Sequence, residues 1–596
     1  MDVTRTFDIL DNLQEICPDK EDILACKRNG KWVKYSVKDY VETAHFLAYG
    51  FLAMGLKEDD KVVTITNNRP EWNCIDLALP MAKMVDIPVY PILSTEDYKH
   101  IIRHSEAKIV FLGNEIICNR LAPLIEELDE KPLVYTVNEI EGYPSINQII
   151  NLGKEKQEEY APILEQIKAN VQPEDVPTII YTSGTTGTPK GVMLTHQGLV
   201  HNFKGHAAMQ IRDTRHRMLS FLPLSHIYER TMNYEYQFLG VSTYYAENLG
   251  TIAADLKDIH ADGFCGVPRV LETIYTKLHA AGKDLSGIKK LIYEWAFRLA
   301  EQFDYTNHSK WYMFKHNLAD KLVYSKWREN FGGHEMLVVS GGSSIQERII
   351  RLFTAAKFYI FEGYGLTETS PVIAVNNPKE MAIRIGTVGR VLDGVEVKLA
   401  DDGEILTRGV CLMKGYYKDP EYTKQVIDED GWFHTGDIGK FTEGGYLKIT
   451  DRKKEIFKLS GGKYIAPQLI ENKFKESSFI ENIIVVGENE KFASAIIIPN
   501  FNYLHFWASK YKVHYRNNDA LISDERVLQR LQKEVDSINT GLAPHEQIKR
   551  YKFVNDEWGV QTGELSPTLK LKRSVLNKKY GELMKQIFGQ HEYEHE

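Results

Sequence analysis

This chain of 596 residues has no long apolar run and no excess of basic residues. No stretch approaches the roughly 18 to 20 apolar residues that span a membrane, and no basic segment followed by an apolar one opens the chain. We therefore expect a cytoplasmic protein, with at most peripheral contact at the inner membrane face. The net charge of −9 argues against a nucleic-acid partner, because binding to a phosphate backbone requires a basic footprint.

Cysteine is also scarce, and its spacing excludes two further classes. None of the six cysteines stands in a Cys-x-x-Cys pair. Scattered cysteines suit reduced, mostly buried thiols better than disulfides or a zinc site, so we expect no structural metal. They are Cys17, Cys26, Cys74, Cys118, Cys265 and Cys411.

Apolar strand-like runs alternate with helical patterns over most of the chain, which predicts a layered α/β architecture. A chain of this length is too long to fold around a single hydrophobic core, so at least two domains are expected. From residue 395 onward, Gly and Asp turns such as Asp401–Gly403 and Glu443–Gly445 indicate a β-rich section. We place a large α/β domain at residues 1–450, a hinge at 451–454 and a small α+β lobe at 455–596.

The most informative stretch is Tyr181-Thr-Ser-Gly-Thr-Thr-Gly-Thr-Pro-Lys-Gly191. Its glycines allow backbone N–H groups to turn inward, its hydroxyls add donors, and Lys190 supplies a positive charge, as a polyphosphate-binding loop requires. It is not a Walker A loop, which ends in Gly-Lys-Ser/Thr. We expect a buried strand over Val176–Thr182 before it and a helix beginning within Val192–Val200 after it.

This loop resembles the signature of the adenylate-forming superfamily, which activates carboxylic acids with ATP. Three further matches follow in the superfamily's order: Phe361–Glu368, Gly431–Asp437 and Asp451–Lys463. The resemblance implies ATP and Mg²⁺ in one site, coenzyme A as co-substrate, and a small mobile C-terminal lobe. Lys454 is the residue about which that lobe is expected to turn.

The resemblance also assigns roles to individual residues. Thr186 and Glu368 are expected to be catalytic, with Glu368 also the Mg²⁺ ligand. Lys570 is expected to neutralise developing charge, although Leu569 replaces the family's usual glycine and Lys572 lies close by. The nucleotide and pantetheine contacts are expected from Thr182, Ser183, Gly184, Thr185, Thr186, Gly187, Lys190, Gly342, Ser343, Gly363, Tyr364, Gly365, Thr367, Asp437, Arg452, Gly461 and Gly462. Asp437 could alternatively cap a turn, and Tyr364 could simply belong to one.

Two segments give indications of which carboxylic acid is the substrate. The aromatic segment beginning Phe221–Arg230 could wall an apolar tunnel or belong to the core. His226 within it could contact the adenylate, gate the tunnel or merely pack. The stretch Gly263–Arg269 and the helical insertion after it look like the long-chain fatty acyl-CoA synthetase branch. One face of residues 285–303 is apolar and is expected to pack on the protein body more readily than on a bilayer.

The sequence thus predicts a long-chain fatty acid:CoA ligase that forms acyl-AMP and then acyl-CoA. Three alternatives stay open. They are a fatty acyl-AMP ligase that loads a carrier protein, an amino-acid adenylation module, which should carry an acidic residue in its pocket and a following carrier domain, and a non-catalytic lipid-binding protein of the same fold. Chain-length preference and oligomeric state are not predicted.

Overall fold

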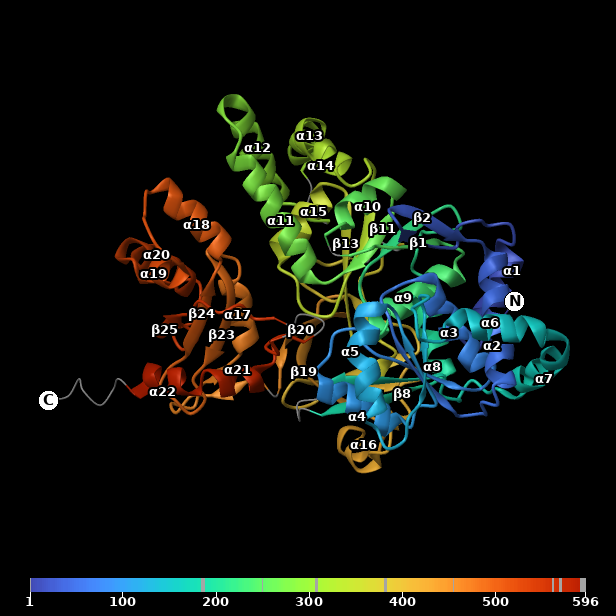
Figure 1. Ribbon diagram of the computed structural model, residues 1–596. Helices are drawn as coiled ribbons and strands as arrows, with labels where there is room; N and C mark the ends of the chain where they lie inside the picture. The colour runs from blue at the N-terminus through green and yellow to red at the C-terminus, as the bar shows by residue number, and fades with distance from the viewer. Residues whose placement is uncertain are drawn as a thin grey trace. The chain divides into compact units, whose positions relative to one another are not determined.

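The computed structural model describes residues 2–183, 188–248, 250–305, 309–379, 383–453, 455–559, 562–566 and 571–589 (Figure 1). The chain divides into two compact units. The first comprises Met1–Val397, Thr407–His434 and Thr442–Leu447, and the second comprises Lys398–Leu406, Thr435–Phe441 and Lys448–Glu596. The mixed α/β class predicted from the sequence is confirmed.

A seven-stranded sheet forms one half of the first unit, in the order β18-β8-β7-β4-β3-β5-β6. Its central strands are parallel, while β8 and β18 are added antiparallel at one edge. The strands are β3 (Lys61–Ile65), β4 (Val85–Pro88), β5 (Ile109–Leu112), β6 (Leu133–Thr136), β7 (Thr178–Ser183), β8 (Pro189–Leu194) and β18 (Gly415–Tyr416).

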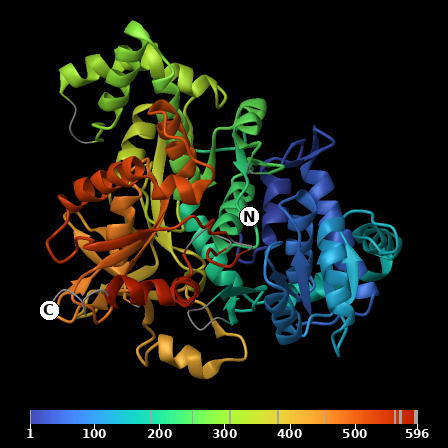
Figure 2. The ribbon, with the colours of Figure 1, turned by 60° about the vertical axis from the view of Figure 1, so that its left-hand side comes forward.

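Both faces of this sheet are covered by helices, which explains why its strands are apolar at consecutive positions. Val63 and Val110 pack with α4 (Thr95–Ser105) and α5 (Glu115–Glu126) on one face. Val62 and Phe111 pack with α2 (Val37–Ala53), α3 (Pro70–Met81) and α6 (Ile146–Glu155) on the other. Figure 2 shows the blue strands between these two helical layers.

The second sheet of this unit has nine strands in the order β15-β14-β13-β12-β11-β9-β10-β1-β2. Its middle, from β1 to β13, is parallel, while β2 at one edge and β14 and β15 at the other are added antiparallel. The strands are β1 (Leu24–Arg28), β2 (Lys31–Tyr35), β9 (Arg217–Ser220), β10 (Ser242–Tyr245), β11 (Gly263–Gly266), β12 (Met336–Ser340), β13 (Phe358–Gly365), β14 (Val372–Val375) and β15 (Arg390–Val391).

The remaining helices of the first unit surround the two sheets. They are α1 (Asp8–Ile16), α7 (Gln157–Asn170), α8 (His196–Ala207), α9 (Ile227–Phe238), α10 (Ile252–Ile259), α11 (Pro268–Lys283), α12 (Gly287–Ala300), α13 (Lys310–Ala319), the π-helical turn η1 (Asp320–Tyr324), α14 (Ser325–Glu329), α15 (Glu347–Ala355), the 3-10 turn η2 (Thr367–Thr369) and α16 (Pro420–Val426). The predicted strands near 61, 108, 176, 335 and 357 and the packed helix α3 are confirmed.

Helix α9 is the centre of the first unit, because it is buried from Ile227 to Gln237. Its Tyr234 joins the core of the seven-stranded sheet, whereas Tyr228 and Met232 join a cluster on the nine-stranded sheet. The predicted aromatic segment is therefore core. Its tyrosine hydroxyls are bonded internally, as in the bond of 2.9 Å from Tyr245 to Asn233 Oδ1.

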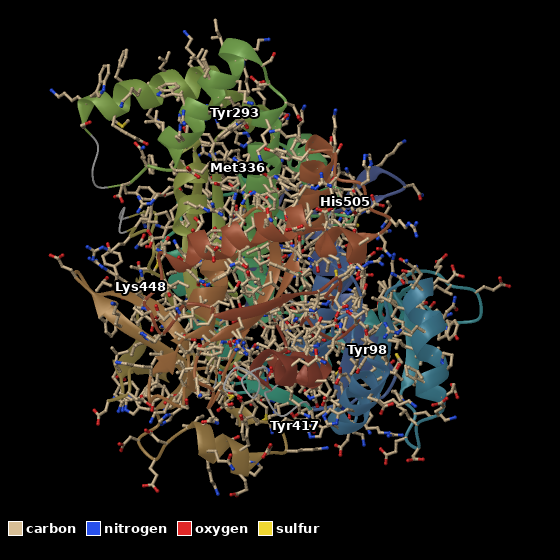
Figure 3. The ribbon with its side chains drawn as sticks, turned by 90° about the vertical axis from the view of Figure 1, so that its left-hand side faces the viewer. Tyr98, Tyr293, Met336, Tyr417, Lys448 and His505 are labelled. Carbon is tan, nitrogen blue, oxygen red and sulfur yellow. The ribbon has the colours of Figure 1, made fainter. Side chains whose placement is uncertain are left out.

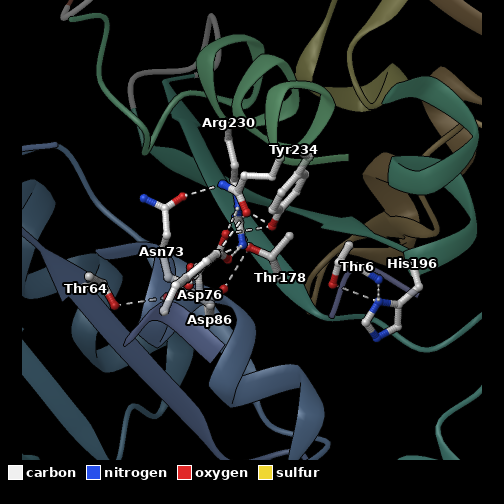
Figure 4. Close-up of polar contacts among 11 residues, drawn as sticks. Thr6, Thr64, Asn73, Asp76, Asp86, Thr178, His196, Arg230 and Tyr234 are labelled. Carbon is white, nitrogen blue, oxygen red and sulfur yellow. Dashed lines mark hydrogen bonds and ion pairs between the residues drawn. The ribbon is translucent and has the colours of Figure 1, made fainter. Parts of the chain in front are cut away.

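One buried arginine ties α9 to its surroundings (Figure 4). Arg230 pairs with the Asp76 carboxylate of α3 and lies 3.3 Å from Asp86 Oδ2 of β4. It also donates to Thr178 Oγ1 of β7 at 2.7 Å and to the Tyr234 hydroxyl at 2.9 Å. The strand that leads into the phosphate loop is thus held by a buried ionic network.

The apolar face predicted over residues 285–303 packs only in part. Leu299 is buried near the end of α12, but Ile288 and Leu291, near its start, are exposed. The expected packing on the protein body is thus confirmed only for the later part of α12, because the start of this helix projects beyond its neighbours with the end of α11 (Figure 1).

A four-stranded sheet of order β16-β17-β19-β20 contains the predicted β-rich section, and the division between the units passes along its strands. It consists of β16 (Val395–Leu399), β17 (Glu404–Gly409), β19 (Phe433–Thr442) and β20 (Tyr446–Arg452). The predicted turns are confirmed, since 401–403 join β16 to β17 and 443–445 join β19 to β20.

The second unit is an α+β structure around the sheet β23-β24-β25. Its buried strands β23 and β24 match the runs predicted near 482 and 493. The elements are β21 (Phe457–Lys458), β22 (Tyr464–Ile465), α17 (Pro467–Phe474), β23 (Ile480–Val486), β24 (Ser494–Pro499), α18 (Phe501–Lys510), α19 (Asn518–Ser523), α20 (Glu525–Asn539), β25 (Arg550–Phe553), α21 (Arg573–Lys579) and α22 (Gly581–Gly589).

All six cysteines are free, and five of them are buried. Over the described ranges, no helix combines the length and apolar character needed to cross a membrane.

Candidate active site

The predicted phosphate loop joins two antiparallel strands. Thr182 of β7 pairs with Lys190 of β8, and the backbone of Ser183 pairs with Pro189. Gly184, Thr185, Thr186 and Gly187 lie outside the described residues. The two stems place Thr182 and Lys190 opposite each other at the base of the loop.

The helix predicted to begin within Val192–Val200 is confirmed, but a second strand, β8, precedes it. Residues up to Leu194 form β8, which is paired on one side with β7 and on the other with β18. Helix α8 begins only at His196, where the Thr195 side chain accepts a bond from Gly198 N. A short apolar run does not distinguish a strand from a helix start, and here the two strand partners, one more than 200 residues away, decided the outcome.

Lys190 contacts the segment of residues 416–422, which was not predicted as part of the site. Its Nζ lies 2.8 Å from Asp419 Oδ2 and 4.0 Å from the centre of the Tyr422 ring. The hydrogen bond from Lys190 lowers the pKa of Asp419. Asp419 also caps α16 by accepting from Tyr422 N at 3.1 Å, so the lysine and the helix start share one carboxylate.

Glu368 is anchored by the same segment. The Tyr416 hydroxyl donates to Glu368 Oε1 at 2.8 Å, and Met413 N donates to the Glu368 carbonyl at 2.8 Å. Burial, aided by this carboxylate, raises the pKa of Tyr416. The rings of Tyr416 and Tyr422 lie 5.1 Å apart. A continuous path of contacts therefore links Lys190 to Glu368 through the 416–422 segment.

Only the three-dimensional pairing of β18 with β8 brings this segment beside the loop. In sequence, Asp419-Pro420 reads as a helix start, since Asp is a favoured N-cap and proline a favoured first residue. That local pattern predicts α16 but does not reveal that Tyr416, Asp419 and Tyr422 contact predicted site residues.

Two histidines of α4 brace the two stems of the loop. His100 Nε2 lies 3.0 Å from the Pro189 carbonyl, just after the loop, and His104 Nδ1 lies 2.8 Å from the Tyr181 hydroxyl, just before it. Burial lowers the pKa of His104. The lowered pKa favours a neutral imidazole at position 104. The two contacts hold the stems of the loop against α4.

The predicted adenine-binding motif forms the end of β13. Tyr364 pairs with Ala374 of β14, and the register shifts between Tyr364 and Gly365. A Cβ on Gly365 would lie 1.8 Å from the Pro371 carbonyl oxygen, so only glycine fits there. At Gly363 a Cβ would make ordinary contact with Val375, at 3.4 Å.

Thr367 and Glu368 lie on the short turn η2 that follows this strand. The turn is fastened by Thr369, whose hydroxyl donates to the Pro371 carbonyl at 2.6 Å and accepts from Leu366 N at 3.0 Å. The carboxylate is therefore presented from a backbone held on both sides.

The small-residue loop after β12 is exposed at Gly342 and Ser343. Its start is packed closely, because a Cβ on Gly341 would lie 3.3 Å from the Tyr228 ring. The Tyr228 hydroxyl also donates to the Val339 carbonyl at 3.0 Å. The loop is thus adjacent to the first turn of α9.

His226 immediately precedes that turn. Its Nδ1 accepts from Tyr228 N at 3.2 Å, so it is the N-cap of α9, and its ring centre lies 6.5 Å from that of Tyr90. This helix-capping role of His226 was not predicted from the sequence. A catalytic or gating role for His226 stays a prediction.

The predicted ribose contacts belong to the second unit and lie together there. Asp437 of β19 is buried, and its Oδ1 is 3.4 Å from Arg452 Nε of β20. Asp437 N also bonds to Thr435 Oγ1 at 3.1 Å. Lys454 and Lys570 lie outside the described residues.

Gly461 and Gly462 form the exposed turn between β21 and β22. Gly462 has a φ of +84°, a conformation that favours glycine, and a Cβ on Gly461 would meet nothing within 4 Å. The predicted residues thus fall into two groups, one around Lys190 and Glu368 in the first unit and one around Asp437 and Arg452 in the second.

The side chains near the loop can be compared with the ligands that the predicted Mg²⁺ would need. Over the described ranges, no three His, Cys, Asp or Glu side chains converge as a preformed metal site. Mg²⁺ is commonly held by one or two carboxylates together with substrate phosphates and water, so Glu368 beside the loop is sufficient on the protein side. The residues fit a metal that arrives with the nucleotide.

A buried glutamate beside this site predicts a pH effect on stability. Glu229 of α9 is fully buried, and burial raises its pKa to about 8, against the hydrogen bonds from Ser220 and Asn233. Because the folded-state pKa is raised, its contribution to stability is complete below about pH 4.5 and is lost as the pH rises towards 8.

We expect Glu229→Gln to flatten that dependence, by up to about 1.4 kcal/mol per pH unit in this window. Urea unfolding of both proteins at several pH values measures it, with exposed Glu155→Gln as the control. Parallel pH profiles for the wild type and Glu229→Gln would contradict the assignment.

Comparison with known proteins covers nearly the whole chain. A family model described as AMP-binding enzyme matches residues 13–417, and one described as AMP-binding enzyme C-terminal domain matches residues 454–592. The chain is 32% identical over 586 residues to long chain acyl-CoA synthetase 6, peroxisomal, of Arabidopsis thaliana, covering 94% of this chain and 82% of that protein. It is 30% identical to the long-chain-fatty-acid–CoA ligase FadD15 of Mycobacterium bovis, covering 94% and 93%.

Among solved structures, the adenylation domain of a carboxylate reductase from Mycobacterium chelonae superposes with a TM-score of 0.74. It shares 20% identity and is covered to 91%, with 98% of this chain included. At that identity the likeness supports the fold alone.

Proposed function

This chain belongs to the AMP-binding enzyme family, and on that premise we propose that it is an ATP-dependent ligase joining a long-chain fatty acid to coenzyme A. The observation that carries the proposal is the similarity to ligases of this name along almost their full length. The cluster of Lys190, Glu368 and the 416–422 segment supports it, because it provides the charge that such a reaction needs.

In the first half-reaction, a carboxylate oxygen of the fatty acid attacks the α-phosphorus of ATP. The bond from that phosphorus to the bridging oxygen breaks, so that acyl-AMP forms and pyrophosphate leaves. Two anions must approach each other, which requires positive charge and tight positioning. Lys190 provides such a charge beside the loop, and Lys570 is expected to provide another.

We assign the nucleotide to the loop and its neighbours. Thr182, Lys190 and the loop hydroxyls would contact the phosphates, and Tyr364 would stack on adenine. Glu368 would hold Mg²⁺, which supplies further positive charge to the phosphates when bound. Asp437 accepts hydrogen bonds well, as contact with two ribose hydroxyls requires, and the nearby Arg452 holds its carboxylate in place.

In the second half-reaction, the thiol of coenzyme A loses its proton and its sulfur attacks the acyl carbon. The bond to the AMP oxygen breaks, which gives acyl-CoA and AMP. We propose that the exposed turn at Gly461 and Gly462 lies along the pantetheine arm, where the lack of side chains permits close approach.

The test of this function is AMP release across acids from acetate to oleate, with and without coenzyme A. Each buried methylene contributes about 0.8 kcal/mol, so kcat/KM for palmitate should exceed that for acetate by at least about a thousandfold. Release that requires coenzyme A supports the ligase. Hydroxamate-dependent pyrophosphate exchange without coenzyme A turnover would instead identify a carrier-loading enzyme, and a flat chain-length profile would reject the substrate class.

A further inference from the structure

Helix α13 has apolar side chains on two opposite faces, and only one of them packs. On the inner face, the Tyr312 hydroxyl donates to the Leu299 carbonyl at 3.1 Å, and His316 Nε2 lies 2.8 Å from the Ala355 carbonyl. Ala319 and Val323 continue this face into the core. The helix is therefore fastened to the first unit without using its other side.

The outer face is an apolar stripe that faces solvent. Trp311, Phe314, Leu318 and Leu322 recur at i, i+3, i+7 and i+11, and they are 65%, 60%, 43% and 38% exposed. The rings of Trp311 and Phe314 stack with centres 5.6 Å apart. Single exposed apolar residues are common, but a regular stripe of four large ones on one helix marks an interaction surface.

The charges around this stripe are mainly positive. Lys310, Lys321 and Lys326 are exposed, and Lys315 Nζ lies 5.6 Å from the Trp311 ring centre. Of the two acidic residues in α13, η1 and α14, Asp320 is paired with Arg328 at 2.6 Å, which leaves Glu329 as the exposed carboxylate of these elements. The surface is thus basic as well as apolar.

We propose that this outer face of α13 and η1 is a docking surface for an anionic lipid bilayer. A helix lying in the interface plane buries apolar side chains below the headgroups, with tryptophan at the boundary and lysines beside the lipid phosphates. Charge complementarity selects an anionic membrane over a neutral one. Figure 1 shows α12, α13 and α14 grouped at one end of the first unit.

The test uses the full chain and sedimentation with vesicles of phosphatidylcholine, alone or mixed with phosphatidylglycerol. We expect the wild type to sediment with the mixed vesicles, less so at high salt, and only weakly with phosphatidylcholine. Trp311→Ser combined with Phe314→Ser should lower the partition coefficient by at least about tenfold. Lys310→Glu combined with Lys321→Glu should remove the preference for the anionic lipid.

A matched control is Ile116→Ser combined with Leu133→Ser, which also removes two exposed apolar side chains of the first unit. It should bind vesicles as the wild type does. Unchanged binding in the Trp311/Phe314 variant, equal loss in the control, or equal binding to both lipids would overturn the proposal. The proposal would also be overturned if the wild type did not bind vesicles but formed a dimer in light scattering, and the Trp311/Phe314 variant were a monomer. Vesicle binding requires no turnover, so its outcome is independent of the proposed ligase activity.

Discussion

Replacing Glu368 with glutamine is expected to slow acyl-AMP formation by about a hundred- to a thousandfold. The carboxylate charge beside Lys190 and the phosphate loop would be lost, and losses of this size follow removal of one group that stabilises transition-state charge. The glutamine is nearly isosteric and can still accept from Tyr416, so the fold should be retained. The rate of pyrophosphate release at saturating ATP and palmitate measures the effect.

Two comparisons make that result specific. Tyr416→Phe keeps the carboxylate and removes only its hydrogen-bond donor, so its rate should fall less than that of Glu368→Gln, by about tenfold, the lower end for one hydrogen bond to a charged group. Glu155→Gln removes an exposed carboxylate on α6 and should leave the rate unchanged. A Glu368→Gln enzyme with a wild-type rate, or one whose Mg²⁺ requirement is unaltered, would reject the role assigned to this residue.

Arg230→Met is expected to destabilise the protein by about 3 to 5 kcal/mol, because two buried carboxylates would lose their shared counter-charge. Arg230 is almost fully buried and contacts both Asp76 and Asp86, together with Thr178 and Tyr234. Urea unfolding at neutral pH measures the loss. Arg408→Met breaks an exposed pair with Glu396 and should leave the stability nearly unchanged.

The direction of the pH effect gives a second check. Burial raises the pKa of Asp86 to about 7, against the opposing charge of Arg230. A carboxyl whose pKa is raised on folding contributes stability at low pH that is lost as the pH rises. Without Arg230 this loss should grow, so the variant should be nearer to the wild type at pH 5.5 than at pH 8. A penalty of equal size at both pH values would mean that ionised Asp76 and Asp86 are not its source.

Much of the fold could be read from local patterns. Consecutive apolar β-branched residues, as in Val62–Val63, predicted strands buried on both faces, and Gly and Asp turns predicted the hairpins around 401–403 and 443–445. The same local reasoning missed the strand over Val192–Leu194, because its pairing with β18 depends on residues more than 200 positions away, although α8 begins within the predicted range. It failed again at Ile288 and Leu291, since periodicity shows which residues share a face and not whether anything covers it.

By itself, the sequence determined the α/β class and the family, because glycine-rich loops and strand-to-turn motifs occupy short contiguous stretches. The roles of the individual site residues stay predictions. Only the tertiary structure decided that Tyr416, Asp419 and Tyr422 join Lys190 to Glu368, that Arg230 anchors β7 to α9, and that the outer face of α13 remains in solvent. Those outcomes depend on contacts between residues far apart in the chain. The pattern of apolar residues along one helix does not indicate which other segment covers that helix.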